Sequence, residues 1–293
     1  MPYVIDSTTA SELLVTVDGN PYVADPSSKE AFDRKTEDLD ACVGSRFATV
    51  DTHDGDAESK AAVNVFLSDA CAALLAICGF GATVGVPVPK TIVYNLPSRT
   101  VTVPNATCAT AELVIQNGKV TMLNAEFWSS SPPARTAGYG LTAPAGPAAQ
   151  NFFYHRDLLS FFTAASAGVT GLSEFRVKLD HQLDPIYGVR SDGLTLPIGF
   201  KAGNPKVTGS FRMRMLGFDD YDRYLAACQV AADLGITAKP FCASGAPTLT
   251  VTPKNTIYTM PQRDGAMKQS FVEVFNFRSR NVAGANPLVA TLL

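Results

Sequence analysis

The residues best suited to chemistry are a histidine between two carboxylates, Asp180, His181 and Asp184. Two carboxylates beside an imidazole can hold and transfer a proton, so general acid–base catalysis is one interpretation of this group. The same segment contains Pro185 and Gly188, which favour turns, and it lies between two segments of alternating apolar and polar residues. We therefore predict a turn at this place and no catalytic site.

A second group, His53-Asp54-Gly55-Asp56, offers nitrogen and oxygen atoms to a metal ion. It lacks the bidentate glutamate and the ligand spacing of a calcium loop, which favours an exposed turn. No cysteine–histidine cluster has the spacing of a zinc site, and no CxxC pair occurs. The sequence therefore predicts no metal site and no cofactor.

Gly79, Phe80, Gly81 and Gly85 resemble part of a dinucleotide-binding loop. That fingerprint follows a strand and opens a helix, whereas this segment follows a predicted helix, so we expect Gly79 to end the helix. No GxSxG or HExxH motif occurs, and the three histidines are widely spaced. A serine–histidine–aspartate triad assembled only in space is the remaining alternative. The sequence favours a protein that is not an enzyme.

The composition is that of a folded protein. The chain has 293 residues, of which 46% are hydrophobic, and a net charge of −3. These values support two ordinary domains or one large β domain, and they exclude global disorder and a general nucleic-acid binder. No apolar run is long enough to cross a bilayer, and the first residues lack the basic start of a secretory signal.

The six cysteines are expected to be reduced and mostly buried in a protein made in a cytosol. Disulfides in a secreted protein are the alternative. The cysteines are Cys42, Cys71, Cys78, Cys108, Cys228 and Cys242.

The first half of the sequence predicts strands on either side of one helix. Residues 11–17 are strand-like, and residues 18–46 are polar and favour a loop or a short exposed helix. Residues 45–52 and 60–67 are moderately strand-like. Residues 67–79 predict a short helix, because alanine and leucine dominate them and a glycine ends them.

Three β-patterns follow the helix, at residues 91–94, 100–103 and 108–116. Asn117-Gly118 predicts a hairpin turn, and residues 119–128 predict the returning strand. The composition then changes. Residues 129–150 are rich in proline, glycine, alanine and serine, which favours a connector. The aromatic residues 151–166 predict a strand or a short helix.

The second half repeats this order of elements. Residues 173–179 and 207–215 alternate between apolar and polar side chains, as half-buried strands do. A helix is predicted over residues 219–235, and strands over residues 247–259 and 267–278. Because strand, strand, helix, strand, strand occurs twice, we predict an internal duplication that superposes residues 10–128 on 171–280.

Several features of the second half resemble the tail tube proteins of long-tailed, non-contractile bacteriophages. They are the stretch from Asp180 to Gly188, the VTGSF strand from Val207 to Phe211, and the acidic helix with Tyr221 and Tyr224. In the first half, Ala72–Phe80 matches best. The loop 191–204 departs from the pattern.

The resemblance implies a mainly β fold with two tail-tube-type β-sandwich or barrel modules, each with a short α-helix. The inner sheets of neighbouring subunits would join into a ring-shaped β-barrel, which would remove their open edges. The expected modules are residues 1–128 and 166–293, joined by the connector and aromatic segment at residues 129–165.

The resemblance also implies a structural virion protein that polymerises as stacked rings into the tail tube, the conduit for genome ejection. Its partners would be other copies of itself, the tape measure protein, and the tail terminator and tip proteins. DNA would pass transiently, and no membrane would be bound. The protein would lie in the virion tail, and in the host cytoplasm during assembly. A trimeric ring with pseudo-sixfold symmetry is favoured, and a hexamer is possible.

The predicted strand at residues 207–215 supplies the candidate assembly residues. Its alternation leaves one face to be covered, and a glycine within it allows close approach of another backbone. The candidates are Val207, Gly209, Phe211, Arg212 and Arg214. The alternative function is a β-rich carbohydrate-binding or adhesion module of a tail tip or cell surface, which would need an exposed aromatic platform.

Overall fold

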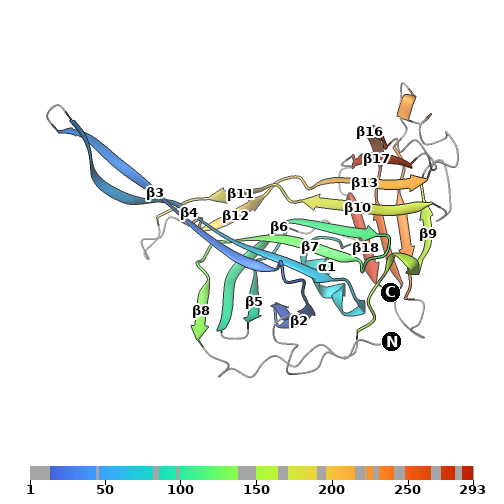
Figure 1. The fold of residues 1–293 in the computed structure, drawn as a ribbon, viewed down its shortest axis with the longest axis horizontal. Coiled ribbons are helices and arrows are strands. Elements are labelled where there is room, and N and C mark those ends of the chain that lie inside the picture. Colours follow the sequence, from blue (N-terminus) through green and yellow to red (C-terminus); the bar gives the residue numbers. More distant parts are fainter. Residues whose placement is uncertain are drawn as a thin grey trace.

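A computed structural model of the chain shows a mainly β protein with antiparallel sheets, as the alternating patterns predict (Figure 1). The structure describes residues 14–43, 46–81, 86–96, 99–137, 150–163, 171–189, 196–214, 222, 224–226, 231–240, 248–264, 272–280 and 286–292. Only the backbone is described at residues 34–43, 46–56, 99, 137, 260–264, 272 and 273.

The strands of the first half are β1 Leu14–Val17, β2 Asn20–Val23, β3 Lys29–Val43, β4 Arg46–Phe66, β5 Lys90–Leu96, β6 Arg99–Gln116, β7 Met122–Ser129 and β8 Ala134–Ala137. Those of the second half are β9 Leu158–Phe162, β10 Leu172–Asp180, β11 Leu183–Ile186, β12 Gly199–Ala202, β13 Lys206–Arg214, β14 Gly235–Ala238, β15 Leu249–Pro253, β16 Thr256–Asp264, β17 Val272–Ser279 and β18 Leu288–Leu292. The helical elements that accompany these strands in the described residues are η2 Asp69–Cys71, α1 Ala72–Ile77 and η3 His155–Asp157.

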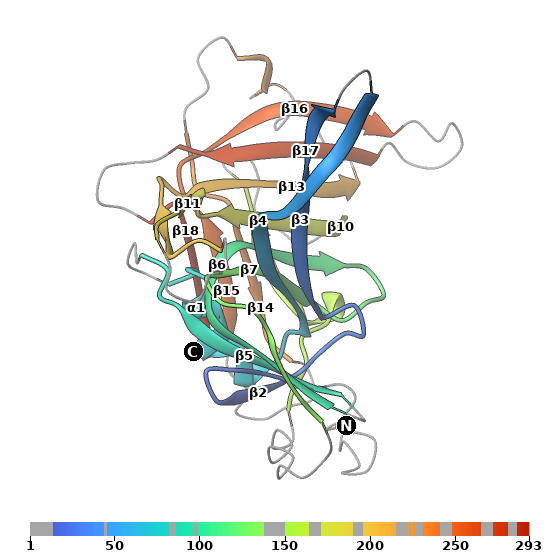
Figure 2. The same ribbon diagram turned by 90° about the vertical axis from the view of Figure 1, so that its left-hand side faces the viewer.

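Eight strands form one antiparallel path through both halves of the chain. Their order is β3-β4-β7-β6-β10-β13-β17-β16, and β6 pairs with β10 where the halves meet. Figure 2 shows β16, β17, β13 and β10 side by side. This eight-stranded path carries the candidate assembly residues.

A second layer covers one face of this path. In the second half it is the four-stranded sheet β18-β15-β14-β9. In the first half it consists of β2, β1, β5 and the first part of β6, which also pairs with β8. In Figure 1 the strands of this layer run across those of the eight-stranded path. The two layers enclose the apolar core, as in a β-sandwich.

The chain changes layer at an asparagine in each half. Within β6, Asn105 lies between the part that pairs with β8 and most of β5 and the part that pairs with β7 and β10, and Ala106 just beyond it still pairs with Lys90 of β5. Asn255 lies between β15 and β16, which belong to different sheets. Both have a left-handed backbone, with φ of 51° and 49°. Asparagine tolerates this conformation better than most residues.

Two hairpins of the path have the same register. In both, a β-bulge interrupts the pairing near one end, between Cys108 and Thr110 in β6 and between Tyr258 and Met260 in β16. Each residue of the second hairpin carries a number 150 higher than its counterpart in the first. The end pairs are Ala106 with Ser129 and Val114 with Met122 in β6–β7, and Thr256 with Ser279 and Asp264 with Val272 in β16–β17.

The hairpin β3–β4 extends far beyond the rest of the molecule as a two-stranded arm (Figure 1). Its base, where β4 also pairs with β7 from Ser59 onward, belongs to the eight-stranded path. The polar segment 18–46 is therefore not the loop or exposed helix that its composition predicts. A two-stranded arm has no second sheet against it, so its charged run needs no alternating apolar face.

Three strand boundaries also differ from the predictions. The patterns at residues 45–52 and 60–67 belong to one strand, β4, and those at 100–103 and 108–116 belong to β6. The predicted strand 247–259 is instead two strands, β15 and β16. Apolar alternation continues through a layer change, because both layers bury one face, so the pattern does not mark where a strand changes partners.

The helix predicted over residues 67–79 is confirmed as η2 and α1, and Gly79 follows with φ of 86°. The helix predicted over 219–235 lies largely outside the described residues, although Asp222 and its neighbours 224–225 are helical. Its predicted end is wrong, because β14 begins at Gly235. A Cβ there would lie 2.1 Å from the Phe162 ring, so this glycine allows close strand packing and does not end a helix.

Candidate assembly surface

The apolar candidates on β13 face the interior of the chain. Val207 and Phe211 are both fully buried. The Phe211 ring stacks on Phe275 at 5.1 Å between centroids and contacts Phe161 of the second layer at 5.3 Å. The face that the sequence leaves to be covered is therefore covered by the chain's own second sheet.

Gly209 serves the same internal packing. A Cβ at this position would lie 2.3 Å from the carbonyl oxygen of Arg176 on β10 and 2.4 Å from Cζ of Phe277 on β17. The close approach expected of this glycine is to strands of its own chain. Any side chain here would separate β10, β13 and β17.

Arg212 and Arg214 lie on the opposite, polar face of the path. Arg212 stands opposite Glu174, and Arg214 is exposed. The same face carries two further cross-strand pairs of opposite charge, Lys178 with Glu112 and Asp180 with Lys206. Opposite charges in directly opposed positions stabilise a sheet modestly and leave this face with mixed charge.

The two ends of the eight-stranded path are open. Over the described residues, β3 pairs only with β4, and β16 pairs with β17 and, at its first residue Thr256 alone, forms a bridge with Ala232. Open edges expose backbone donors and acceptors that can pair with another strand. These edges are not among the predicted assembly residues, although Pro261 within β16 and the charged run of β3 are typical of edge strands.

The hairpin β11–β12 carries an exposed apolar patch at its distal end. Ile186 is 45% exposed, Tyr187 is 49% exposed and Ile198 is 53% exposed, and Val189 is also exposed. Such gathered apolar surface is typical of protein contact sites.

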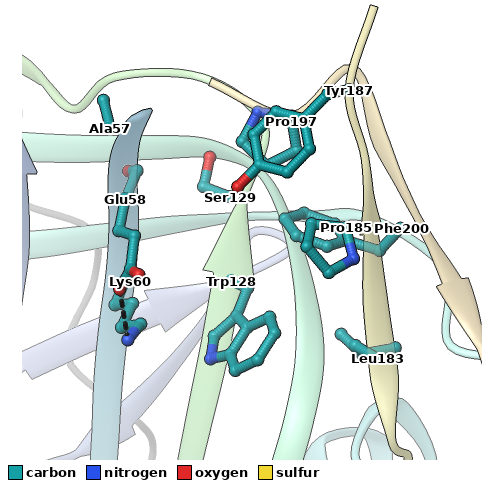
Figure 3. Close-up of a pocket in the computed structure, with 11 residues that line it drawn as sticks. Ala57, Glu58, Lys60, Trp128, Ser129, Leu183, Pro185, Tyr187, Pro197 and Phe200 are labelled. Carbon is teal, nitrogen blue, oxygen red and sulfur yellow. Dashed lines mark ion pairs between the residues drawn. The ribbon is translucent and has the colours of Figure 1, made fainter. Parts of the chain in front are cut away.

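A groove of about 180 Å³ separates this hairpin from the base of the β3–β4 arm (Figure 3). The ring of Trp128 on β7 meets Phe200 of β12 edge-on at 6.1 Å between centroids. Lys60 of β4 lies 5.5 Å from the Trp128 ring centre and 2.6 Å from Glu58. The Trp128 indole Nε1 donates a hydrogen bond of 2.6 Å to Glu126. Through Trp128, these contacts connect the base of the β3–β4 arm to the β11–β12 hairpin.

The Asp180, His181 and Asp184 group does not form an acid–base site. His181 is buried, and its Nε2 donates a hydrogen bond of 3.1 Å to the carbonyl of Cys78. Burial lowers the pKa of this histidine. Asp184 lies exposed on β11, which is a strand where the sequence predicts a turn. His181 instead packs the end of β10 against the glycine that follows α1, Gly79.

The other chemical candidates also have structural explanations. His53 and Asp54 lie within strand β4, opposite Glu37 and Thr36, so the predicted exposed turn is wrong. Gly79 has the left-handed backbone that ends a helix, as expected. No group of three potential metal ligands occurs among the residues that the structure describes.

Three of the cysteines are free and buried, namely Cys71, Cys78 and Cys108. Burial raises the pKa of the Cys71 thiol, and a hydrogen bond with Cys78 together with burial raises that of Cys108. Such thiols are protonated and poorly nucleophilic at neutral pH. The side chain of Cys42 and the residues Cys228 and Cys242 lie outside the described part.

No protein-family model and no curated protein sequence matches the chain. Within the described ranges, no helix has both the length and the apolar character needed to span a membrane.

Proposed function

We propose that this protein is a structural subunit of the tail tube of a long-tailed, non-contractile bacteriophage. Copies would associate into rings, and the rings would stack into the conduit through which the genome leaves the capsid. The protein would act without a catalytic site, a metal or a cofactor. Its location would be the virion tail, and the host cytoplasm during assembly.

The observation that carries this proposal is the eight-stranded path with an open edge at each end. A sheet that has one buried face, one polar face and two free edges is suited to continue into the sheets of neighbouring copies. We propose two tube modules, residues 1–128 and 166–293, that each contribute four strands to this sheet. The connector, residues 129–165, would include β8, which pairs with β6, and β9, which pairs with β14.

The polar face supports a channel that lets DNA pass. Over the described residues, its cross-strand pairs of opposite charge, such as Lys178 with Glu112, place acidic side chains beside basic ones. A strongly basic lining would hold DNA through its phosphates, whereas a mixed one would not. In this arrangement Arg212 and Arg214 would face the channel or the next ring.

The hairpins β3–β4 and β11–β12 support the stacking of rings. The β3–β4 arm extends beyond the molecule, and the β11–β12 hairpin exposes apolar side chains near the base of that arm (Figure 1). These elements would contact the neighbouring ring. The tape measure protein inside the tube and the terminator and tip proteins at its ends would be the other partners.

Three copies would supply about 24 strands to the ring, enough for a barrel with an open channel, because barrel diameter grows with strand number. We therefore favour a trimeric ring with pseudo-sixfold symmetry over a hexamer. Negative-stain microscopy of the purified protein tests the proposal. Tubes or stacked rings with three chains in end-on class averages are expected. Six chains per ring would contradict the trimer, and discrete particles or monomers would contradict the tube.

A carbohydrate-binding or adhesion module is the second candidate, because Trp128, Tyr187 and Phe200 line the groove in Figure 3. Aromatic side chains of this kind can stack on sugar rings. The chain has one tryptophan, so its fluorescence reports directly on this groove. A saturable change of this emission with an oligosaccharide, lost in Phe200→Ala, would favour the second candidate. A flat titration would support the tube.

A further inference from the structure

The eight-stranded path consists of the same four-strand set twice. The first set, β3-β4-β7-β6, and the second, β10-β13-β17-β16, have the same pairing order. The hairpins β6–β7 and β16–β17 share their register and the place of their β-bulge. Identical register over two long hairpins is a strong sign of equivalent structure, since one residue of slip would reverse every side chain.

The second layer repeats in the same way. Strand β1 pairs with β5, β5 with the first part of β6, and that part of β6 with β8. In the second half, β9 pairs with β14, β14 with β15, and β15 with β18. The layer change at Asn105 corresponds to the one at Asn255. The two halves therefore share one pattern of strand pairing in both layers. The predicted superposition of residues 10–128 on 171–280 leaves out β9, which holds the place of β1 in the second half.

The junction between these units is visible within the chain. The last strand of the first set, β6, pairs antiparallel with the first strand of the second set, β10. The pairing runs from Thr110 opposite Asp180 to Gln116 opposite Glu174. The counterpart of β6 in the second set is β16, and the counterpart of β10 in the first set is β3. Both of these counterparts are the open edges of the described sheet.

We propose that β16 of one copy pairs with β3 of the next copy, in the register that β6 and β10 have within the chain. The occupant of each open edge is thus a second copy of the same protein. Such a head-to-tail contact closes into a ring when its rotation divides a full turn.

The register follows from residues that hold equivalent places. In the first set, Lys60 stands opposite Trp128. In the second set, Thr208 stands opposite Arg278, which is the counterpart of Trp128. Lys60 and Thr208 are therefore counterparts. Ala31 is opposite Lys60 and Lys178 is opposite Thr208, so Ala31 is the counterpart of Lys178.

Within the chain Lys178 faces Glu112, whose counterpart is Gln262. The proposal therefore places Ala31 of one copy opposite Gln262 of its neighbour.

One neighbouring pair carries complementary charge, because the same register places Lys29 opposite Asp264. It also places Glu30 opposite Arg263, but the Glu30 carboxylate already lies 3.5 Å from Arg135 of its own chain. Within the chain the counterpart pairs are Arg176 with Val114 and Val177 with Leu113, which have no opposed charges. Opposite charges in facing positions favour one register and one partner. Pro261 removes at most one backbone donor from β16, which an edge strand tolerates.

This inference rests on the self-assembly part of the proposed function and names the two strands that form the contact. Disulfide cross-linking tests it. In Ala31→Cys/Gln262→Cys, mild oxidation should link copies into a ladder of multimers on a denaturing gel. The sites lie at opposite ends of one chain's sheet, so a ladder reports contacts between copies. In Ala31→Cys/Arg263→Cys, where the second thiol points to the other face, the ladder should be at least several-fold weaker.

Further variants separate folding from contact. Glu112→Cys/Lys178→Cys places two thiols at the observed internal junction, so it should form a bond within one chain and show that oxidation captures two residues in this register. The charge reversal Lys29→Glu should raise the concentration needed for assembly roughly two- to five-fold, and Asp264→Lys in the same chain should restore it.

The outcomes distinguish the two proposals. A ladder specific to Ala31→Cys/Gln262→Cys supports the junction. If this ladder forms but microscopy shows no tubes, only the proposed tube is overturned. Tubes without this ladder overturn the junction and leave the tube standing. Monomers at every concentration overturn both.

Discussion

Asn105 and Asn255 adopt the same left-handed backbone at the same place in the two halves of the chain, where it passes from one layer of the sandwich to the other. Both follow closely on a proline, Pro104 or Pro253. A residue with φ near 50° turns the strand direction within one residue. The two asparagines therefore let one continuous stretch of chain serve both layers.

Replacing either asparagine should test this equivalence. Glycine should be tolerated at both positions, because it adopts positive φ without steric cost. Valine should lower the free energy of unfolding by about 1–2 kcal/mol at each position, because a β-branched side chain clashes with the backbone in the left-handed region. Urea unfolding of Asn105→Val and Asn255→Val measures the effect. A large loss at one position and none at the other would contradict the equivalence.

Substitutions on β13 should act on folding before they act on assembly. Gly209→Val should lower the free energy of unfolding by about 1–3 kcal/mol, because its side chain overlaps the Arg176 carbonyl and the Phe277 ring. Phe211→Ala should cost about 3–5 kcal/mol through the cavity left among the stacked aromatic rings. Ser210→Ala, on the polar face between them, is the matched control and should be near neutral. Normal unfolding of Gly209→Val would mean that the described packing is wrong.

The stability of the protein should depend on His181 below neutral pH. Its pKa in the folded state is lower than in the unfolded state, because burial disfavours the charged ring. The unfolded chain therefore binds the proton more readily. The contribution of neutral His181 is complete above the unfolded pKa, about 6.5, and decreases as the pH falls below that value toward the folded pKa.

Unfolding measured between pH 7.5 and about 5 checks this expectation. His181→Gln should show a shallower decline of stability with acidification than the original chain. Equal slopes in the original chain and in His181→Gln would contradict the assignment.

The buried thiols should resist labelling while the protein is folded. Cys71, Cys78 and Cys108 are buried, and the pKa of Cys71 and of Cys108 is raised, so a maleimide should react with these three positions only after denaturant is added. Mass spectrometry of the labelled peptides identifies the sites. Rapid labelling of Cys108 in the native protein would show that the sandwich opens at β6.

The sequence could predict those parts of the fold that are written in local patterns. The alanine- and leucine-rich composition with its closing glycine predicted the helix that ends before Gly79, and alternation predicted β10 and β13, because each buries one face. Alternation could not predict the β3–β4 arm, because the run of charged residues in β3 does not follow the pattern of a half-buried strand. It also joined β15 to β16 across Asn255, because apolar alternation does not record which sheet a strand belongs to.

For the candidate assembly residues, too, the sequence determined one part and the tertiary structure another. Their spacing alone determined that Val207 and Phe211 share one face and Arg212 and Arg214 the other, because side chains alternate along a strand. Only the tertiary structure decided what covers the apolar face, since Phe161, Phe275 and Phe277 reach Phe211 from distant parts of the chain. It also decided which strands are left as open edges, because pairing partners are set by long-range contacts that no local pattern records.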